Sequence, residues 1–265
     1  MSEPSDAATN ADSLKFETMN FGMVLDRAIH LYSKNFALLI GIMVIPEALG
    51  YLNSFISTRI TQHYQAGGMF LYLPVSLLVS LLLFGISAGA VTVALSNRYL
   101  GKEISILQAY RAAFRRLGTL LGAWIVAWLL IMVGFFVIVP GIMLAISFCL
   151  ITPVIMLESQ TAKESRKRSR ELVKGFRWQT LGLFVIYFLI QSTLHYATNY
   201  LVNLLTGSGQ SVFLSNSYLH QLAGAPIQIL LAPFLAILTV LIYYNQRIRK
   251  EGFDLLLLAE ALAEE

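Results

Sequence analysis

The sequence predicts an all-α integral membrane protein: a bundle of six transmembrane helices in three hairpins, each preceded by a cytoplasmic amphipathic helix. Composition, six long apolar runs and the placement of basic residues predict this class. Of the 265 residues, 57% are hydrophobic and 13% are charged, whereas a soluble domain carries about a quarter charged residues. The mean hydropathy is +0.67. We therefore expect the surrounding medium to be lipid.

Six apolar runs are long enough, or nearly so, to cross a bilayer, which takes about 20 residues at 1.5 Å each. We expect crossings at about 36–57, 69–96, 118–139, 141–157, 179–201 and 223–244. Only the VPG sequence at residues 139–141 separates the third crossing from the fourth. A proline followed by a glycine predicts a tight turn at the membrane surface.

The basic residues orient this bundle. All nineteen Lys and Arg residues except Arg59 precede the first crossing, lie in the second or fourth connection, or follow the sixth crossing. Cytoplasmic loops carry the excess of such residues, so both termini are expected to be cytoplasmic. We expect a disordered cytoplasmic tail at 1–19, a transmembrane domain at 20–250 and a cytoplasmic C-terminal segment at 251–265.

A unit of interfacial helix, outward crossing, turn and inward crossing is predicted to occur three times. Two of the interfacial helices begin with capping-box spacing, in which the first side chain caps the helix amides. These pairs are Ser105 with Gln108 and Thr161 with Glu164. The interfacial helices are predicted at 21–35, 105–117 and 162–175. The crossings that follow align on Gly41, Gly122 and Gly182.

The third interfacial helix is the most basic and contains the run RKRSR. Near an anionic leaflet each Lys or Arg contributes about 1 kcal/mol of binding. We therefore expect anionic lipid headgroups as partners of Arg166, Lys167, Arg168 and Arg170. The alternative is that this helix only covers the inner face of the bundle. Nucleic acid is not an expected partner, because no aromatic residues alternate with these cations.

Glu47 is the one charged residue between Phe36 and Thr58, inside the first crossing. A charged group at such depth costs about 2.5–3.5 kcal/mol, so it is expected to face the interior of the bundle. Alignment of the repeats places Gln191 three residues from its depth, and His195 and Asn199 follow on the same strip of the fifth crossing. Asn53 and Gln228 are expected in the same outer half of the membrane. The predicted intramembrane polar cluster is Glu47, Asn53, Gln191, His195, Asn199 and Gln228.

Two interpretations of this cluster remain open. In the first, which we prefer, Glu47 is protonated or hydrogen-bonded to His195 or Gln191 and joins the first and fifth helices. In the second, Glu47 and His195 titrate in an outward-open cavity that carries a small or lipid-like solute. No catalytic motif or metal-binding spacing is present, so no catalytic residue, metal or cofactor is expected.

Three blocks of the sequence resemble a known family. They are FGMVLDRAIHLYSKNF, VPGIMLAISFCLITPVIMLE and YYNQRIRKEGFDLLLLAE. They resemble the uncharacterised bacterial multi-pass proteins that have a glycerophosphoryl diester phosphodiesterase membrane domain. Members usually have Asp at the position of Asn245, Glu near Leu256 and often Arg near Ser147. The resemblance implies a bacterial inner-membrane location and no enzyme activity, because the chain has no room for the catalytic domain of some relatives.

The expected function is that of a non-enzymatic, lipid-associated component of the bacterial inner membrane, or a partner of other envelope proteins. The alternative is the carrier described above.

Overall fold

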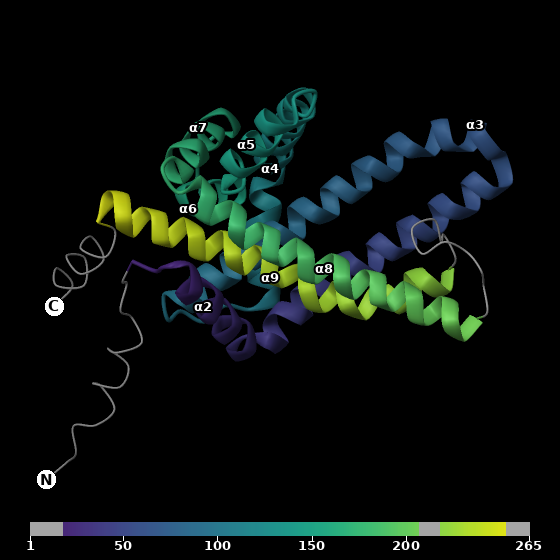
Figure 1. The fold of residues 1–265 in the computed structure, drawn as a ribbon, viewed down its shortest axis with the longest axis horizontal. Coiled ribbons are helices and arrows are strands. Elements are labelled where there is room, and N and C mark those ends of the chain that lie inside the picture. Colours follow the sequence, from purple (N-terminus) through teal and green to yellow (C-terminus); the bar gives the residue numbers. More distant parts are fainter. Residues whose placement is uncertain (1–17, 207–217, 253–265) are drawn as a thin grey trace, which may run out of the picture.

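The computed structural model describes residues 18–206 and 218–252, and within them the fold is all-helical (Figure 1). The predicted tail and C-terminal segment therefore fall almost wholly outside the described residues. The helices are α2 (Phe21–Lys34), α3 (Phe36–Tyr99), α4 (Ile106–Gly134), α5 (Ile138–Ser147), α6 (Ile151–Glu158), α7 (Ala162–Val173), α8 (Arg177–Thr206) and α9 (Tyr218–Glu251).

Six helical segments of the described chain are long and apolar enough to cross a membrane. They are Phe36–Ile60, Tyr72–Tyr99, Ile106–Gly134, Ile138–Glu158, Arg177–Leu205 and His220–Glu251. Each overlaps one predicted crossing, which confirms the all-α class with six spans. The third span begins earlier than expected, because the predicted interfacial helix at 105–117 continues into the crossing as the first part of α4. The division into three repeated units stays a prediction.

The first two spans belong to α3, which doubles back on itself at one end of the molecule (Figure 1). Asn53 on the first limb donates a hydrogen bond of 3.0 Å to the Ser76 hydroxyl on the second limb. In a straight helix these residues would lie about 35 Å apart at 1.5 Å per residue. The Tyr72 hydroxyl also donates to Asn53, at 3.0 Å. These bonds tie the two limbs together near the bend.

Pro46 interrupts the hydrogen bonding of the first limb of α3, and a neighbouring helix compensates. A proline has no N–H, so the carbonyl four residues earlier loses its donor. That carbonyl belongs to Ile42, and it accepts a hydrogen bond from the Tyr110 hydroxyl of α4. In a membrane no water is present to satisfy such a group. The contact therefore lets the first span contain a proline.

The expected turn at residues 139–141 is wrong, because the chain turns just before them. α4 ends at Gly134 and α5 begins at Ile138, which places Pro140 in the first turn of α5. There a proline is tolerated, since the first amides of a helix lack an acceptor within it. Gly141 is required for a different reason: an added Cβ would lie 2.8–2.9 Å from atoms of Phe135. Close packing under the turn explains the glycine.

The fourth span is also broken, between α5 and α6, and Ser169 of α7 bridges the break. The Ser169 hydroxyl donates to the carbonyl of Ser147 at 2.8 Å and accepts from the amide of Leu150 at 3.1 Å. Ser169 is fully buried. One side chain thus satisfies two backbone groups that the break leaves outside the helical hydrogen-bond pattern.

α9 runs through the middle of the molecule and contacts α2, α3, α6, α7 and α8 (Figure 1). Its side chains Ile237, Leu238 and Leu241 are fully buried in the largest hydrophobic cluster. Near its C-terminal end, Asn245 accepts from the amide of Met19 at 2.8 Å and donates to the carbonyl of Met19 at 3.0 Å. Both ends of the described chain therefore meet at one end of the bundle, as an even number of crossings requires.

Both predicted capping boxes are formed. At the start of α4, the Ser105 hydroxyl accepts from the amide of Gln108, and the Gln108 side chain accepts from the amide of Ser105. The same reciprocal pair joins Thr161 and Glu164 at the start of α7. Hydrogen bonds from Thr161 lower the pKa of the Glu164 carboxyl below its ordinary value. These caps set where two helices begin at the edge of the apolar region.

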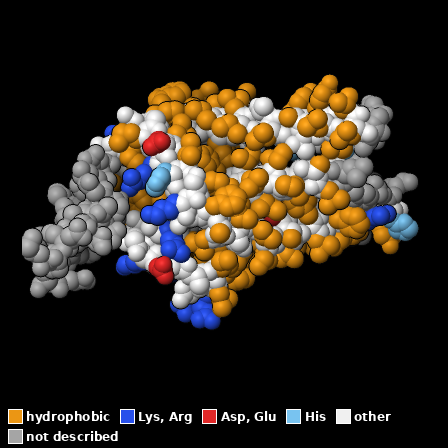
Figure 2. Space-filling view, turned by 90° about the horizontal axis from the view of Figure 1, so that it is seen from below, with side chains coloured by type: hydrophobic (Ala, Val, Ile, Leu, Met, Phe, Trp, Pro, Cys, Tyr) orange, Lys and Arg blue, Asp and Glu red, His pale blue; other side chains and the backbone are white. Residues whose placement is uncertain are grey.

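The surface of the described residues divides into a basic end and an apolar band. Figure 2 shows Lys and Arg side chains gathered at the end where the two ends of the described chain meet, beside a broad surface of hydrophobic side chains. Exposed apolar residues such as Phe136, Leu205 and Phe70 are 80% exposed or more. In water such a surface would be a large exposed patch, whereas in a bilayer it faces lipid tails.

We expect the basic end to face the cytoplasm, which labelling of single cysteines will test. Cys149 is the only cysteine, so Cys149→Ala gives a background without thiols. A cysteine replacing the exposed His63 should react with a membrane-impermeant maleimide in intact cells. Cysteines replacing the exposed Lys102 or Lys167 should react only after permeabilisation. Reaction at Lys167→Cys in intact cells would contradict this orientation.

Candidate functional site

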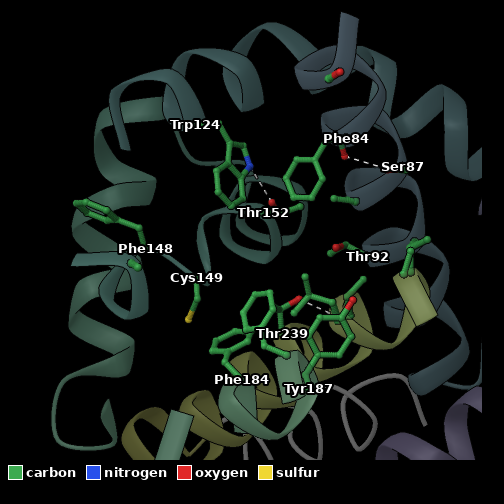
Figure 3. Close-up of a pocket in the computed structure, with 18 of the residues that line it drawn as sticks. Phe84, Ser87, Thr92, Trp124, Phe148, Cys149, Thr152, Phe184, Tyr187 and Thr239 are labelled. Atoms are coloured by element: carbon green, nitrogen blue, oxygen red, sulfur yellow. Dashed lines mark hydrogen bonds between the residues drawn. The ribbon is translucent and has the colours of Figure 1, made fainter. Parts of the chain in front are cut away.

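A cavity of about 560 Å³ lies inside the spans and is lined by all six of them. Figure 3 shows aromatic and hydroxyl side chains converging on it from α3, α4, α6, α8 and α9. Its volume falls within the range of about 300–1,000 Å³ that is typical of small-molecule sites. Most lining residues are apolar, as in such sites generally. The cavity is therefore the first candidate for a functional site.

One wall of the cavity is built from aromatic rings that support one another. Phe84 and Trp124 meet edge to face, with ring centroids 5.3 Å apart. The Trp124 indole nitrogen donates to the Thr152 hydroxyl at 3.1 Å (Figure 3). A buried tryptophan needs such a partner for its N–H. This wall thus joins α3, α4 and α6 and presents ring faces and edges to the cavity.

Two hydroxyl groups in the cavity bond to backbone carbonyls of their own helices, whereas that of Thr92 does not. Ser87 donates to the carbonyl of Phe84 at 3.0 Å, and Thr239 donates to the carbonyl of Ala236 at 2.8 Å. Thr92 is only 1% exposed, and its hydroxyl has no hydrogen-bond partner. Figure 3 shows Thr92 directed from α3 into the cavity. Since a buried polar group without a partner is unfavourable, a ligand atom opposite Thr92 would stabilise it.

Glu47 lies in this cavity and is its only charged lining residue. Its side chain is partly buried on the first limb of α3. Within residues 18–206 and 218–252, no hydrogen bond or ion pair holds its carboxylate. Tyr187 of α8 and Gln228 of α9 line the same cavity. The carboxylate is therefore available to a molecule that enters.

The predicted polar cluster is only partly assembled around Glu47. Gln228 lines the cavity and accepts a hydrogen bond of 2.6 Å from Gln191, which lies behind it on α8. Asn53 is buried between the two limbs of α3, where Ser80 connects it to the cavity wall. Asn199 is buried on α8, and His195 is exposed on α8; neither lines the cavity.

The expected contact between Glu47 and His195 or Gln191 is therefore absent from the described structure. The spacing of Gln191, His195 and Asn199 places them along one strip of a helix, but spacing does not determine which neighbour that strip meets. α8 packs mainly along α9. Its polar side chains accordingly pair with α9, as Gln191 does with Gln228 and Asn203 does with His220 at 2.8 Å.

A second polar cluster lies at the basic end and joins α6, α7 and α9. The Arg168 guanidinium binds both carboxylate oxygens of Glu158, the shortest contact being 2.9 Å, and Glu251 at 2.5 Å. Arg247 binds Glu251 at 3.1 Å, and the Tyr243 hydroxyl donates to Glu158 at 3.1 Å. Burial alone would lower the pKa of Arg168, but its hydrogen bonds to Glu251 and Glu158 raise it above the ordinary value.

This cluster divides the four predicted headgroup residues into two kinds. Arg168 is held by two carboxylates, and its side chain is 27% exposed. The Lys167 side chain is 80% exposed and lies 3.9 Å from Glu171. Arg170 is exposed and lies over the Phe148 ring, 5.5 Å from its centroid, and Arg166 is partly exposed. The sequence analysis did not single out Glu158. Its position as a lone acid at the basic end of the fourth crossing was the signal that could have identified it.

Comparisons with known proteins do not assign this site. No protein-family model, no curated protein and no solved structure matches the chain. No group of three His, Cys, Asp or Glu residues that could hold a metal ion occurs in the part of the chain that the structure describes. Function must therefore be argued from the geometry and chemistry of the site itself.

The contacts of Gln191 and Glu47 predict opposite results when each is replaced by leucine. Gln191→Leu removes the donor to Gln228 and should lower the free energy of unfolding by about 0.6 kcal/mol and at most about 1.7 kcal/mol. Glu47→Leu leaves no partner unsatisfied and should leave stability unchanged or raise it. Thermal unfolding of delipidated protein in detergent measures both. A clear loss of stability in Glu47→Leu would mean that the carboxylate joins helices after all.

Proposed function

We propose that this multi-pass membrane protein is a non-enzymatic, lipid-associated component that holds a lipid-like molecule in the cavity at Glu47. The observation that carries the proposal is the apolar cavity of about 560 Å³ within the spans. Several lining residues, among them Phe84, Val185 and Phe188, are also exposed, so the cavity is open on part of the apolar surface. A cavity of this size, lined mostly by apolar side chains, offers water few partners but offers an alkyl chain many contacts.

The position of the cavity also supports a lipid-like occupant. Its walls come from segments whose outer surfaces are rich in exposed apolar residues, so lipid tails are the molecules at highest local concentration. The non-enzymatic part of the proposal is supported by the lining itself. Glu47 is the only acid there and has no histidine, lysine or arginine beside it, so no acid–base pair lines the cavity.

The proposal places the protein in the inner membrane of a bacterium, with both termini in the cytoplasm. The gathering of Lys and Arg at one end supports this orientation through the positive-inside rule. The three sequence blocks that resemble the bacterial multi-pass family support the location. A role as a partner of other envelope proteins is compatible with holding a lipid.

A second candidate function is a carrier that moves a small or lipid-like solute through the same cavity. The observation that favours it is the unpaired carboxylate of Glu47, since ionisable residues in spans often mark substrate pathways. The pair of Glu47 with His195 is not part of this version, because His195 is exposed away from the cavity. Uptake of a labelled alkyl solute into proteoliposomes separates the carrier from a static binder.

Filling the cavity should displace its lipid-like occupant. Gly50 lines the cavity, and a Cβ added there meets no atom within 4 Å, so Gly50→Leu extends into the cavity without a clash. Gly224 also has no atom within 4 Å of an added Cβ but does not line the cavity, which makes Gly224→Leu the matched control. Native mass spectrometry should find a bound lipid-like molecule in wild type and Gly224→Leu and lose most of it in Gly50→Leu.

Equal retention of the molecule by Gly50→Leu and Gly224→Leu would contradict the assignment to this cavity. Both variants should elute as folded protein in size exclusion, since leucine is a better helix former than glycine. A variant that aggregates would be replaced by Gly50→Val, which tests the same space with a smaller side chain.

The exposed cations of α7 should bind anionic headgroups. Replacing Arg166, Lys167 and Arg170 by Gln should reduce the anionic lipid that copurifies, with the largest difference at low salt, where charges are least screened. Arg168→Gln is the contrast. It should leave copurified lipid unchanged and lower thermal stability, because it removes the cation that binds both Glu158 and Glu251. Lipid content that is unchanged in the triple variant would leave α7 as a covering helix.

A further inference from the structure

We propose that the cavity selects an amphiphile with an ammonium head group, and that the Glu47 carboxylate is its counter-ion. This inference rests on the proposed function and names the class of ligand. Every lining residue other than Glu47 is uncharged. A fatty acid or another anion would therefore be repelled in a medium of low dielectric constant, whereas a cation would be attracted.

The surroundings of the Glu47 carboxylate leave room for such a head group. Gly50 follows Glu47 by three residues, so both lie on the same face of α3. The position of a Cβ on Gly50 is empty to at least 4 Å. A small cationic group therefore has space on the helix face that carries the Glu47 carboxylate.

A further feature of the cavity suits this class of ligand. Tyr187 of α8 lines it and is nearly fully buried, and ring faces attract cations. The remaining wall, from Phe84 and Trp124 to Phe184, suits an alkyl chain (Figure 3).

Binding of three probes that share a twelve-carbon chain tests the choice of head group. Delipidated protein in non-ionic detergent at pH 7 is titrated with radiolabelled dodecylamine, dodecanol or dodecanoate. We expect wild type to bind the amine about tenfold or more tightly than the alcohol, as a hydrogen bond to a charged group implies. Dodecanoate should bind more weakly than the alcohol.

Glu47→Gln keeps the size of the side chain and removes its charge. It should bind amine and alcohol with affinities that agree within about twofold. Glu103→Gln is the matched control, because it also removes one negative charge, and the Glu103 side chain is 93% exposed at the basic end, away from the cavity. It should keep the preference of wild type. Gly50→Leu should weaken the binding of both probes.

The outcomes separate this inference from the proposed function. If wild type shows no preference for the amine, or if Glu47→Gln keeps it, the head-group assignment is wrong. In that case the proposed function is still supported if wild type binds the alkyl probes and Gly50→Leu abolishes that binding. If none of the three probes binds wild type, both proposals fail. Native mass spectrometry of gently extracted protein then tells whether a supported ammonium ligand is an ethanolamine lipid or a single-chain amine.

Discussion

The constraint on which the rest of this structure depends is that backbone polar groups inside a bilayer must find partners within the protein. The helical hydrogen-bond pattern of the first span is interrupted at Pro46, and that of the fourth span between α5 and α6. The Tyr110 hydroxyl satisfies the carbonyl freed by Pro46, and Ser169 satisfies two groups at the other break. These contacts connect α4 with α3 and α7 with α5 and α6. At these two interruptions, neighbouring helices are also joined.

Glu47 has no partner among the residues that the structure describes, whereas several polar side chains of the neighbouring helices are paired. Two side-chain amides of α8 form hydrogen bonds with α9. Gln191 donates to Gln228, and Asn203 bonds to His220. Glu158 and Glu251 at the basic end are bound by Arg168 and Arg247. In the cavity, by contrast, no hydrogen bond or ion pair among the described residues holds the Glu47 carboxylate. This contrast is what makes the cavity, rather than the basic end, the better candidate for binding a ligand.

Much of the fold could be predicted from the sequence, whereas the site could be predicted only in part. The six apolar spans and both capping boxes depend on composition and on spacing within about four residues, and both were confirmed. The turn at residues 139–141 was predicted wrongly. A proline is also suited to the first turn of a helix, and a glycine is also suited to close packing, so the pair does not by itself indicate a turn. His195 was placed beside Glu47 wrongly, because depth in the membrane was estimated but rotation about the helix axis was not.

By itself, the sequence determined that this chain is helical, that six of its segments are apolar enough to cross a membrane, and that its cations gather on one side of them. These properties follow from local composition, since the length and apolar character of a helical span can be recognised without knowing its neighbours. Only the tertiary structure decided that Glu47 faces a cavity, that Arg168 is held by Glu158 and Glu251, and that Gln191 meets α9. Those facts depend on how whole helices rotate and cross, which many weak side-chain contacts set together.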